Sequence, residues 1–278
     1  MKSITKMELL RAFKNKYFYL AITIGIGITI WHYFRYSYIL AEGIYKVYKG
    51  TMFPTFFEKV LYGSPAVQAW IGTQTVGYNI YFFIMPLLCA IPYGVSLCLD
   101  KKSGYINNIT TRVDKKKYYK AKVLAVFLSG GAVAVIPLVV NLLLCMCTLP
   151  IMFPLASSML FPVTSYSLFG DLFYSHTSMY ILIYLLFDLI FFGLLNCLCV
   201  VITYFEDNRF TVALSPFVIY FAVHVFCSWG LGKGDYSPMV YTYLPHFYVQ
   251  NAGIILAQIL ILLILALLTI RGSKHDTI

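Results

Sequence analysis

The chain has 278 residues, of which 60% are hydrophobic and only 12% are charged, whereas roughly 25% of the residues in a typical soluble domain are charged. This composition excludes a soluble protein and therefore a soluble nucleic-acid-binding module, despite a formal net charge of +10. A helix that crosses a bilayer core needs an apolar run of about 20 residues. The chain contains several such runs and is expected to be a multi-pass membrane protein.

Residues 1–16 predict an amphipathic helix that lies at the membrane interface. Apolar residues recur every three or four positions, at Ile4, Met7, Leu10, Phe13 and Tyr17. Basic residues occupy other positions, as is typical of interfacial helices. A basic tail that only anchors the chain to the membrane surface is the alternative interpretation. The apolar run that follows is long enough to span, so no cleavable signal peptide is predicted.

Six apolar runs predict membrane-spanning helices and an all-α membrane domain over the whole chain, 1–278. The runs cover 17–38, 76–99, 122–149, 178–205, 212–231 and 252–270. Prolines inside the second, third and fifth runs predict kinks. Small residues in the first and third runs, Gly25 with Gly27 and Gly130 with Gly131, predict close packing between helices.

Basic residues are distributed unevenly between the two sides of this predicted bundle. An even number of spans places both termini on one side, and every Lys and Arg belongs to that side except Arg35, Lys46, Lys49, Lys59 and Lys233. Lys and Arg collect in cytoplasmic segments, so both termini are expected to be cytoplasmic. The aromatic-rich connection between the fifth and sixth runs predicts a short helical hairpin that dips into the outer leaflet.

No motif for enzymatic chemistry is present. The sequence contains neither a Walker A motif nor an HExxH motif. The seven cysteines lie in or beside apolar runs and are expected to pack as small hydrophobic residues without forming disulfides. Two pairs have i, i+2 spacing, which points their thiols in different directions on a helix and opposes metal chelation. We therefore expect no catalytic residue, no metal site and no cofactor bound by this chain.

Two ionisable residues lie inside predicted spans, Asp188 in the fourth and His224 in the fifth. A carboxylate near the bilayer centre costs roughly 2.5 to 3.5 kcal/mol, so Asp188 is expected to face protein, water or a partner. It either lines a translocation cavity or is a packing residue, protonated or hydrogen-bonded to Asn196 or a tyrosine. His224 is a second candidate for that cavity, but packing is favoured for it, because one tyrosine or one carbonyl satisfies a neutral imidazole.

The connection between the second and third spans, 100–121, contains ordered apolar, aromatic and glycine positions as well as charges. A segment that only linked the two spans would not need them. Ser103 and Gly104 predict a break after the second span, which allows a short helix over 105–112 to turn sideways. We expect this segment to have a function of its own.

The predicted short helix carries an apolar edge formed by Tyr105, Ile106 and Ile109. Such an edge suits a groove on a soluble partner. Arg112 and the lysines at 115–117 suit acidic groups of that partner or the phosphates of lipids. The alternative is a basic loop that rests on lipid headgroups.

The connection and its neighbouring spans contain a particular order of parts. A basic amphipathic helix, a first span and a long outer loop precede a kinked second span. An acidic-x-x-Ser-Gly-Tyr-Ile sequence, a later Arg and a Tyr-Tyr-x-x-Lys sequence then lead into a third span that contains Gly-Gly. The residues concerned are Asp100, Ser103, Gly104, Tyr105, Ile106, Arg112, Tyr118, Tyr119, Lys122, Gly130 and Gly131. In this order the chain resembles the permease subunits of the ABC type 2 exporter family, in architecture over nearly its whole length and in motif over about 100–131.

The resemblance implies a coupling helix that docks on a separate cytoplasmic ATPase, with two ATPase subunits that bind ATP and Mg²⁺. The residues that it assigns to ATPase coupling are Asp100, Ser103, Gly104, Tyr105, Ile106, Ile109, Arg112, Tyr118, Tyr119 and Lys122. It also implies a second permease subunit, identical or paralogous, and a path between the two lined mainly by the first, second and fifth spans. A bacterial plasma membrane is implied as the location.

The expected function is therefore export of an amphipathic substrate, such as a peptide, an antibiotic or a lipid-like compound, by alternating access. A second hypothesis is an ion-coupled secondary transporter in which Asp188 carries the proton. A membrane enzyme is disfavoured, because the sequence shows no nucleophile–base pair and no metal-ligand set.

Overall fold

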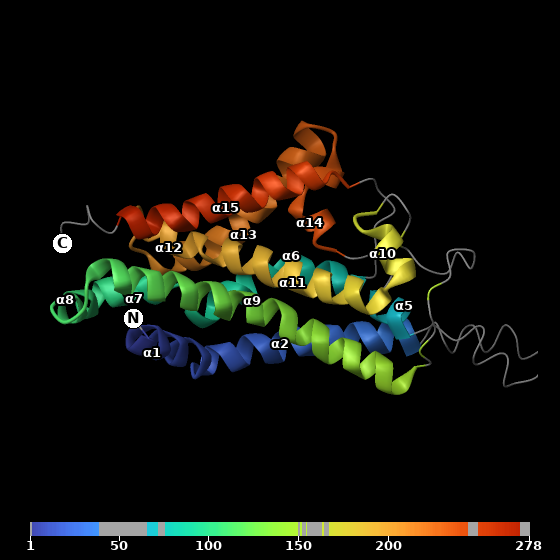
Figure 1. The fold of residues 1–278 in the computed structure, drawn as a ribbon, viewed down its shortest axis with the longest axis horizontal. Helices are drawn as coiled ribbons and strands as arrows, with labels where there is room; N and C mark the ends of the chain where they lie inside the picture. The colour runs from blue at the N-terminus through green and yellow to red at the C-terminus, as the bar shows by residue number, and fades with distance from the viewer. Residues whose placement is uncertain are drawn as a thin grey trace, which may run out of the picture.

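The computed structural model describes residues 2–38, 66–71, 76–149, 151, 154, 163, 167–243 and 250–272. Every regular element in these ranges is helical (Figure 1). Lys46, Lys49 and Lys59 of the predicted outer loop and residues 273–278 lie outside the described residues.

Six helical segments in the described ranges are long and apolar enough to cross a membrane. They are Lys16–Arg35, Val76–Lys102, Lys115–Thr148, Thr177–Ile202, Arg209–Gly230 and Ala252–Arg271. Each overlaps one predicted span, so the prediction of six helices of spanning length and apolar composition is confirmed. The architecture is that of a multi-pass, α-helical membrane protein.

Several spans are composed of more than one helix. The first contains α2 (Lys16–His32) and η1 (Tyr33–Tyr38), and the second contains α6 (Val76–Tyr93) and α7 (Ser96–Lys102). The third is α9 (Lys115–Thr148), and the fourth contains α11 (Thr177–Asn196) and α12 (Leu198–Ile202). The fifth contains α13 (Arg209–Val225) and η3 (Phe226–Gly230), and the sixth is α15 (Ala252–Gly272). The shorter helices are α1 (Lys2–Phe13), α5 (Ala66–Ile71), α8 (Tyr105–Thr110), α10 (Gly170–Ser175), η4 (Gly234–Tyr236) and α14 (Pro238–Tyr241).

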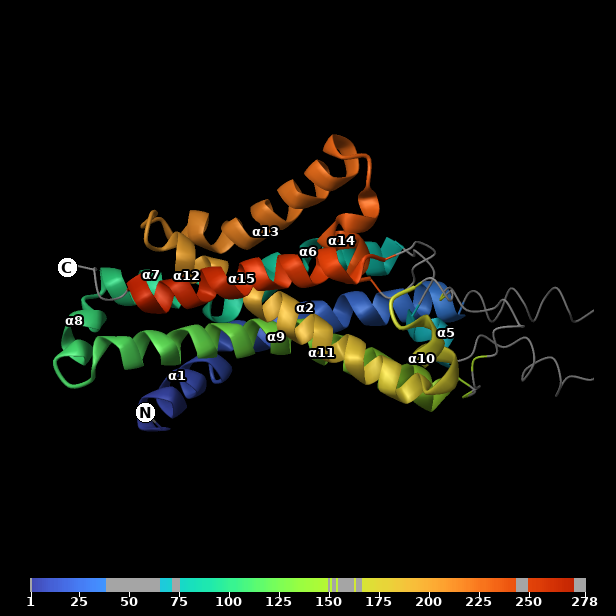
Figure 2. The same cartoon turned by 45° about the horizontal axis from the view of Figure 1, so that its top comes forward.

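The central helix of the bundle is α9, which packs against α1, α2, α6, α11 and α15. Figures 1 and 2 show it running along most of the molecule's length. At the periphery, α13 packs mainly on α6 and diverges from the bundle toward η3 (Figure 2). Both α13 and α15 expose many large apolar side chains, as expected of helices that contact lipid or another subunit.

Glycines allow α9 and α11 to come into close contact. A Cβ atom at Gly131 would lie 2.6 Å from the carbonyl oxygen of Leu189, and one at Gly130 would lie 2.6 Å from Nδ2 of Asn196. Larger residues at these positions would push the two helices apart. The prediction that Gly130 and Gly131 permit close packing is confirmed.

One end of the bundle contains the start of α1, the end of α15 and all of α8 (Figures 1 and 2). The start of α13 lies at the same end, whereas α5 and α10 lie at the opposite one. We call it the basic end, because most of the described Lys and Arg residues belong to the segments found there. The chain thus enters and leaves its set of spans at one end.

Two sequence-based expectations concern α1 and the connection between the fifth and sixth spans. The first helix forms, but its buried face is Ile4, Glu8 and Ala12, which packs toward α9, while Leu10 is 44% exposed. An interfacial helix would present such an exposed leucine to lipid, so the interfacial position of α1 stays a prediction. Between the fifth and sixth spans, the described residues form the short helices η4 and α14. Residues 244–249 are outside the described residues, so the helical hairpin stays a prediction.

Candidate functional site at the basic end

The chain reverses direction at the basic end through α7, α8 and the start of α9. Gly104 separates α7 from α8 and has a φ of 69°, in the left-handed region that favours glycine. A Cβ atom at this position would meet nothing within 4 Å. The glycine is therefore required by the backbone conformation and not by lack of space. The predicted break and the sideways helix are both present.

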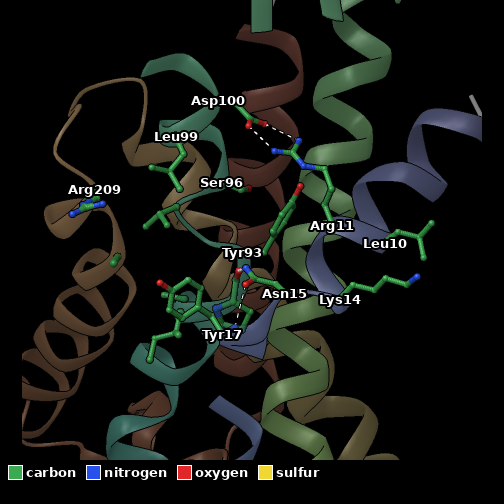
Figure 3. Close-up of a pocket in the computed structure, with 15 residues that line it drawn as sticks. Leu10, Arg11, Lys14, Asn15, Tyr17, Tyr93, Ser96, Leu99, Asp100 and Arg209 are labelled. Carbon is green, nitrogen blue, oxygen red and sulfur yellow. Dashed lines mark hydrogen bonds and ion pairs between the residues drawn. The ribbon is translucent and has the colours of Figure 1, made fainter. Parts of the chain in front are cut away.

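Four charged side chains meet beside this turn: Glu8, Arg11, Asp100 and Lys122. The Lys122 ammonium group lies 2.6 Å from Glu8 Oε2 and 2.6 Å from Asp100 Oδ2. Arg11 lies 3.0 Å from Glu8 Oε1 and 2.8 Å from Asp100 Oδ1, and Figure 3 shows it reaching Asp100 from α1. Two cations and two carboxylates thus form a closed ring, which we call the charge cluster.

Two tyrosines complete the hydrogen bonding of the charge cluster. The Tyr93 hydroxyl donates to Glu8 at 2.5 Å, and the Tyr118 hydroxyl donates to Asp100 at 2.6 Å. Lys122 also donates to the Tyr93 oxygen at 3.1 Å. Its ammonium group lies 4.8 Å from the centre of the Tyr93 ring and 5.3 Å from that of Tyr118. The buried ammonium group is thereby in contact with two carboxylates, one hydroxyl and two aromatic rings.

Burial makes the charge cluster sensitive to the loss of any member. Glu8 and Lys122 are fully buried and Asp100 is nearly so, whereas the Arg11 side chain is 37% exposed. Burial alone would lower the pKa of Arg11, but the hydrogen bond to Asp100 and the nearby negative charges raise it, so Arg11 stays protonated. Removing one partner from such a group leaves an uncompensated charge in the interior.

The charge cluster joins three segments that are far apart in sequence. Glu8 and Arg11 belong to α1, Tyr93 and Asp100 to the second span, and Tyr118 and Lys122 to α9. The charge cluster therefore links α7 and α9, the two helices that flank α8, to each other and to α1.

Ile106 occupies a different position from the one expected. It is only 1% exposed and belongs to the same apolar cluster as Ile4 and Tyr118. The prediction that Ile106 forms part of an exposed apolar edge was wrong, because the interior of the chain takes up this side chain. A helix of six residues is too short for its sequence pattern to show which face turns inward.

Tyr105 and Ile109 are both partly buried. The Arg11 guanidinium lies 4.7 Å from the centre of the Tyr105 ring, and the Tyr105 hydroxyl lies 3.9 Å from Met7 Sδ. Burial raises the pKa of Tyr105, so its hydroxyl is neutral at physiological pH. Tyr105 therefore extends the charge cluster toward α8.

The outward surface of the turn is polar. Asn107, Asn108, Thr111 and Arg112 are exposed, and Lys116 and Lys117 continue this surface at the start of α9. A partner that contacts the turn would therefore meet amides, hydroxyls and cations, together with the exposed carboxylate of Asp114.

The remaining residues of the predicted coupling motif are also placed by internal contacts. The Ser103 hydroxyl donates to the Asp100 carbonyl oxygen at 3.4 Å. Tyr119 is buried, and its ring stacks on that of Tyr204 with centroids 6.2 Å apart. The motif thus brings Asp100, Tyr118 and Lys122 together and anchors the turn around them, and it leaves Arg112 at the surface.

Asp188 and His224 lie away from the charge cluster, on α11 and α13. Asp188 is fully buried, as its insertion cost predicts, and in the described part of the chain neither carboxylate oxygen has a hydrogen-bond partner. The alternative that Asn196 or a tyrosine bonds it was wrong for the described residues, because both oxygens lack a partner there. Asn196 donates instead to the Val126 carbonyl oxygen at 2.9 Å. His224 Nδ1 lies 2.7 Å from Ser237 Oγ, so a serine hydroxyl satisfies this imidazole.

Sequence reasoning missed three members of the site, Glu8, Arg11 and Tyr93. Glu8 is the only acidic residue within 1–16, and Arg11 follows it at i+3. An isolated carboxylate in a basic segment was the signal that could have found the pair. Tyr93 gave no signal, because a tyrosine near the end of a span is also typical of the membrane interface.

All seven cysteines are free. Over the ranges that the structure describes, no group of three or more His, Cys, Asp or Glu residues is arranged to hold a metal ion. In comparisons with other proteins, no family model, no curated protein and no solved structure matches the chain.

Proposed function

We propose that the chain is the membrane-spanning permease subunit of an ATP-driven exporter of the ABC type 2 family. The observation that carries this proposal is the charge cluster, which fixes both flanks of α8 to α1. ATP and Mg²⁺ would bind to separate cytoplasmic subunits, two per transporter. This chain would have no enzymatic activity of its own.

A coupling element has to pass a movement of the ATPase to the membrane helices, and the contacts around α8 suit that task. Four ion-pair contacts of 3.0 Å or less are made by Lys122 and Arg11. They link α1 with α7 and α9, the two helices that flank α8. A loop that only rested on headgroups would not require a buried, fully compensated group of charges at its base. Closure of the ATPase subunits would then displace α7, α9 and α1 together.

The surface of the turn indicates which chemical groups on the ATPase would bind to it. Asn107, Asn108 and Arg112 are exposed. Carboxylates and carbonyl oxygens on the partner would complement them, and such contacts fix orientation and raise the rate of association. This polar interface replaces the apolar groove that the sequence favoured.

The same proposal includes the arrangement of the whole transporter. The basic end and both termini face the cytoplasm, because Lys and Arg collect on that side, and the resemblance to the family implies a bacterial cell. A second permease subunit, identical or paralogous, packs against this one in the plasma membrane. An amphipathic substrate passes between them along a path lined mainly by α2, α6 and α13.

The proposal is tested by purifying the full chain from its native membrane with and without Arg112→Glu. A stoichiometric nucleotide-binding subunit should copurify with the unchanged chain. Charge reversal at Arg112 should reduce its recovery and abolish substrate-stimulated ATP hydrolysis, because a carboxylate would then face carboxylates. Lys233→Glu is the matched control, since Lys233 is also exposed but lies between the fifth and sixth spans.

Two results would contradict the proposal. One is transport by the purified chain without any ATPase subunit. The other is unchanged copurification and unchanged hydrolysis after Arg112→Glu in a correctly folded chain.

One observation supports a second candidate, an ion-coupled transporter. Asp188 is fully buried, and among the described residues its carboxylate has no hydrogen-bond partner, so no other side chain occupies the oxygens that a transported proton would bind. This candidate predicts transport without ATP that is lost in Asp188→Asn at normal expression. Loss of expression in that variant would instead assign Asp188 to packing.

A further inference from the structure

A pocket of about 670 Å³ lies beside the charge cluster at the basic end (Figure 3). Its walls come from the junction of α1 and α2, from the end of α6 with α7, and from the first turn of α13. The lining residues that matter most here are Leu10, Lys14, Tyr17, Ser96, Leu99 and Arg209.

The pocket has an excess of positive charge. Lys14 and Arg209 come from different walls and lie on opposite sides of it in Figure 3. Both are exposed, and within the ranges described neither forms an ion pair. Asp100 also lines the pocket, but Arg11 and Lys122 already compensate its charge. An anion that entered would therefore meet two uncompensated cations.

Ser96 supplies a second and independent feature. It lines the pocket, is only 6% exposed, and its hydroxyl has no hydrogen-bond partner in the part of the chain that the structure describes. A buried hydroxyl without a partner is unfavourable, so a bound oxygen acceptor would gain from its donation. The pocket thus combines two cations with a hydroxyl ready to donate.

Apolar side chains at the same pocket indicate that the ligand is an amphiphile. Leu10 and Leu99 are each 44% exposed and Tyr17 is 49% exposed. Lys14 lies just before the first span and Arg209 starts the fifth, which places the cations at the level of the lipid headgroups. A free inorganic ion would not use the apolar rim, whereas lipid acyl chains would cover it.

We propose that this pocket binds the phosphate headgroup of an anionic phospholipid from the leaflet at the basic end. Lys14 and Arg209 attract the phosphate, Ser96 donates to one of its oxygens, and the acyl chains lie over Leu10 and Leu99. A lipid bound in this way joins the start of the first span to the start of the fifth. This inference goes beyond export, because it needs the membrane position of the spans and no ATPase.

The test is a titration of the full chain in detergent with phosphatidylglycerol or phosphatidylcholine, followed by native mass spectrometry. Lys14→Gln with Arg209→Gln should weaken phosphatidylglycerol binding about tenfold or more. The control Lys117→Gln with Lys120→Gln removes the same charge from exposed lysines at the same end. It should change the affinity less than about twofold, and phosphatidylcholine should bind weakly throughout.

Ser96→Ala separates a built site from a diffuse basic surface, because it leaves every charge in place. It should weaken phosphatidylglycerol binding about threefold or more, whereas Ser175→Ala, at the exposed opposite end, should leave it unchanged. Equal losses in the Lys117 and Lys120 control, or unchanged binding in Ser96→Ala, would overturn the proposal in favour of general surface charge. Displacement of the lipid by inorganic phosphate at similar concentration would overturn it in favour of a free-phosphate site.

Discussion

Lys122 and Glu8 form an ion pair of 2.6 Å in which both side chains are fully buried. The pair connects α9, the central helix of the bundle, with α1 at the start of the chain. A charge left alone at such a position is costly, so each residue requires the other. The first helix is therefore an integral part of the bundle and not a detachable surface segment.

Lys122→Met should destabilise the protein strongly. The substitution leaves Glu8 and Asp100 with Arg11 as their single compensating cation, and we expect a loss of about 3 to 5 kcal/mol in the free energy of unfolding. Chemical denaturation in detergent measures it. Lys120→Met, at an exposed position of α9, should cost less than about 0.5 kcal/mol.

A double-mutant cycle tests whether Glu8 and Lys122 depend on each other. Glu8→Gln alone should be destabilising, but it should cost about 1 to 3 kcal/mol less when Lys122 is already Met. Strict additivity of the two losses would show that the pair contributes nothing beyond its separate members.

Gly104→Ala should destabilise the turn because of backbone strain alone. An L-residue at a φ of 69° costs about 1 to 2 kcal/mol, and no atom lies close enough to add a clash. Gly104→Asn should cost less, since asparagine tolerates the left-handed region better. Thermal unfolding in detergent compares the two variants, and an Ala variant as stable as the parent would contradict the expected conformation.

Gly25→Ala and Gly27→Ala should differ although they lie two residues apart in α2. A Cβ atom at Gly25 would be 2.7 Å from Pro137 Cγ, whereas one at Gly27 would meet nothing within 4 Å. We expect the first to cost about 1 to 3 kcal/mol through overpacking. The second should be neutral or stabilise by about 0.5 to 1 kcal/mol. Equal unfolding midpoints would contradict the close approach of α2 to α9.

The orientation in the membrane can be tested by cysteine labelling of intact cells. Of the seven cysteines only Cys147 is exposed, so Cys147→Ser provides the background. A membrane-impermeant maleimide should label Lys233→Cys and spare Lys117→Cys, because the basic end is expected inside. The opposite pattern would reverse the proposed topology.

The sequence was sufficient to predict the spans and the break at the basic end. Apolar runs of spanning length have few alternatives to a membrane helix, and Gly104 marks a conformation that other residues avoid. Burial of Asp188 followed from its cost in lipid. Each of these conclusions depends on local sequence or on the membrane alone.

The charge cluster was beyond such reasoning, because its members come together only through tertiary packing. Glu8 lies in a basic amphipathic pattern that favours a surface position, and nothing nearby in sequence indicates that Lys122 is its partner. The inward direction of Ile106 depends in the same way on where α1 and α9 lie. A local sequence pattern shows which residues share a face of a helix. It does not show which other helix packs against that face.

The contact between α9 and α11 limits how this protein can change shape. Backbone atoms at Gly131 and Leu189 are so close that the two helices cannot slide along each other without breaking their packing. Together α9 and α11 form a rigid pair of helices that extends from the basic end toward the opposite end of the bundle. In the exporter proposed above, a path would then open and close by tilting or shear of other helices, such as α13 and α15, against α9 and α11. Substitutions that stiffen those outer contacts should trap one state.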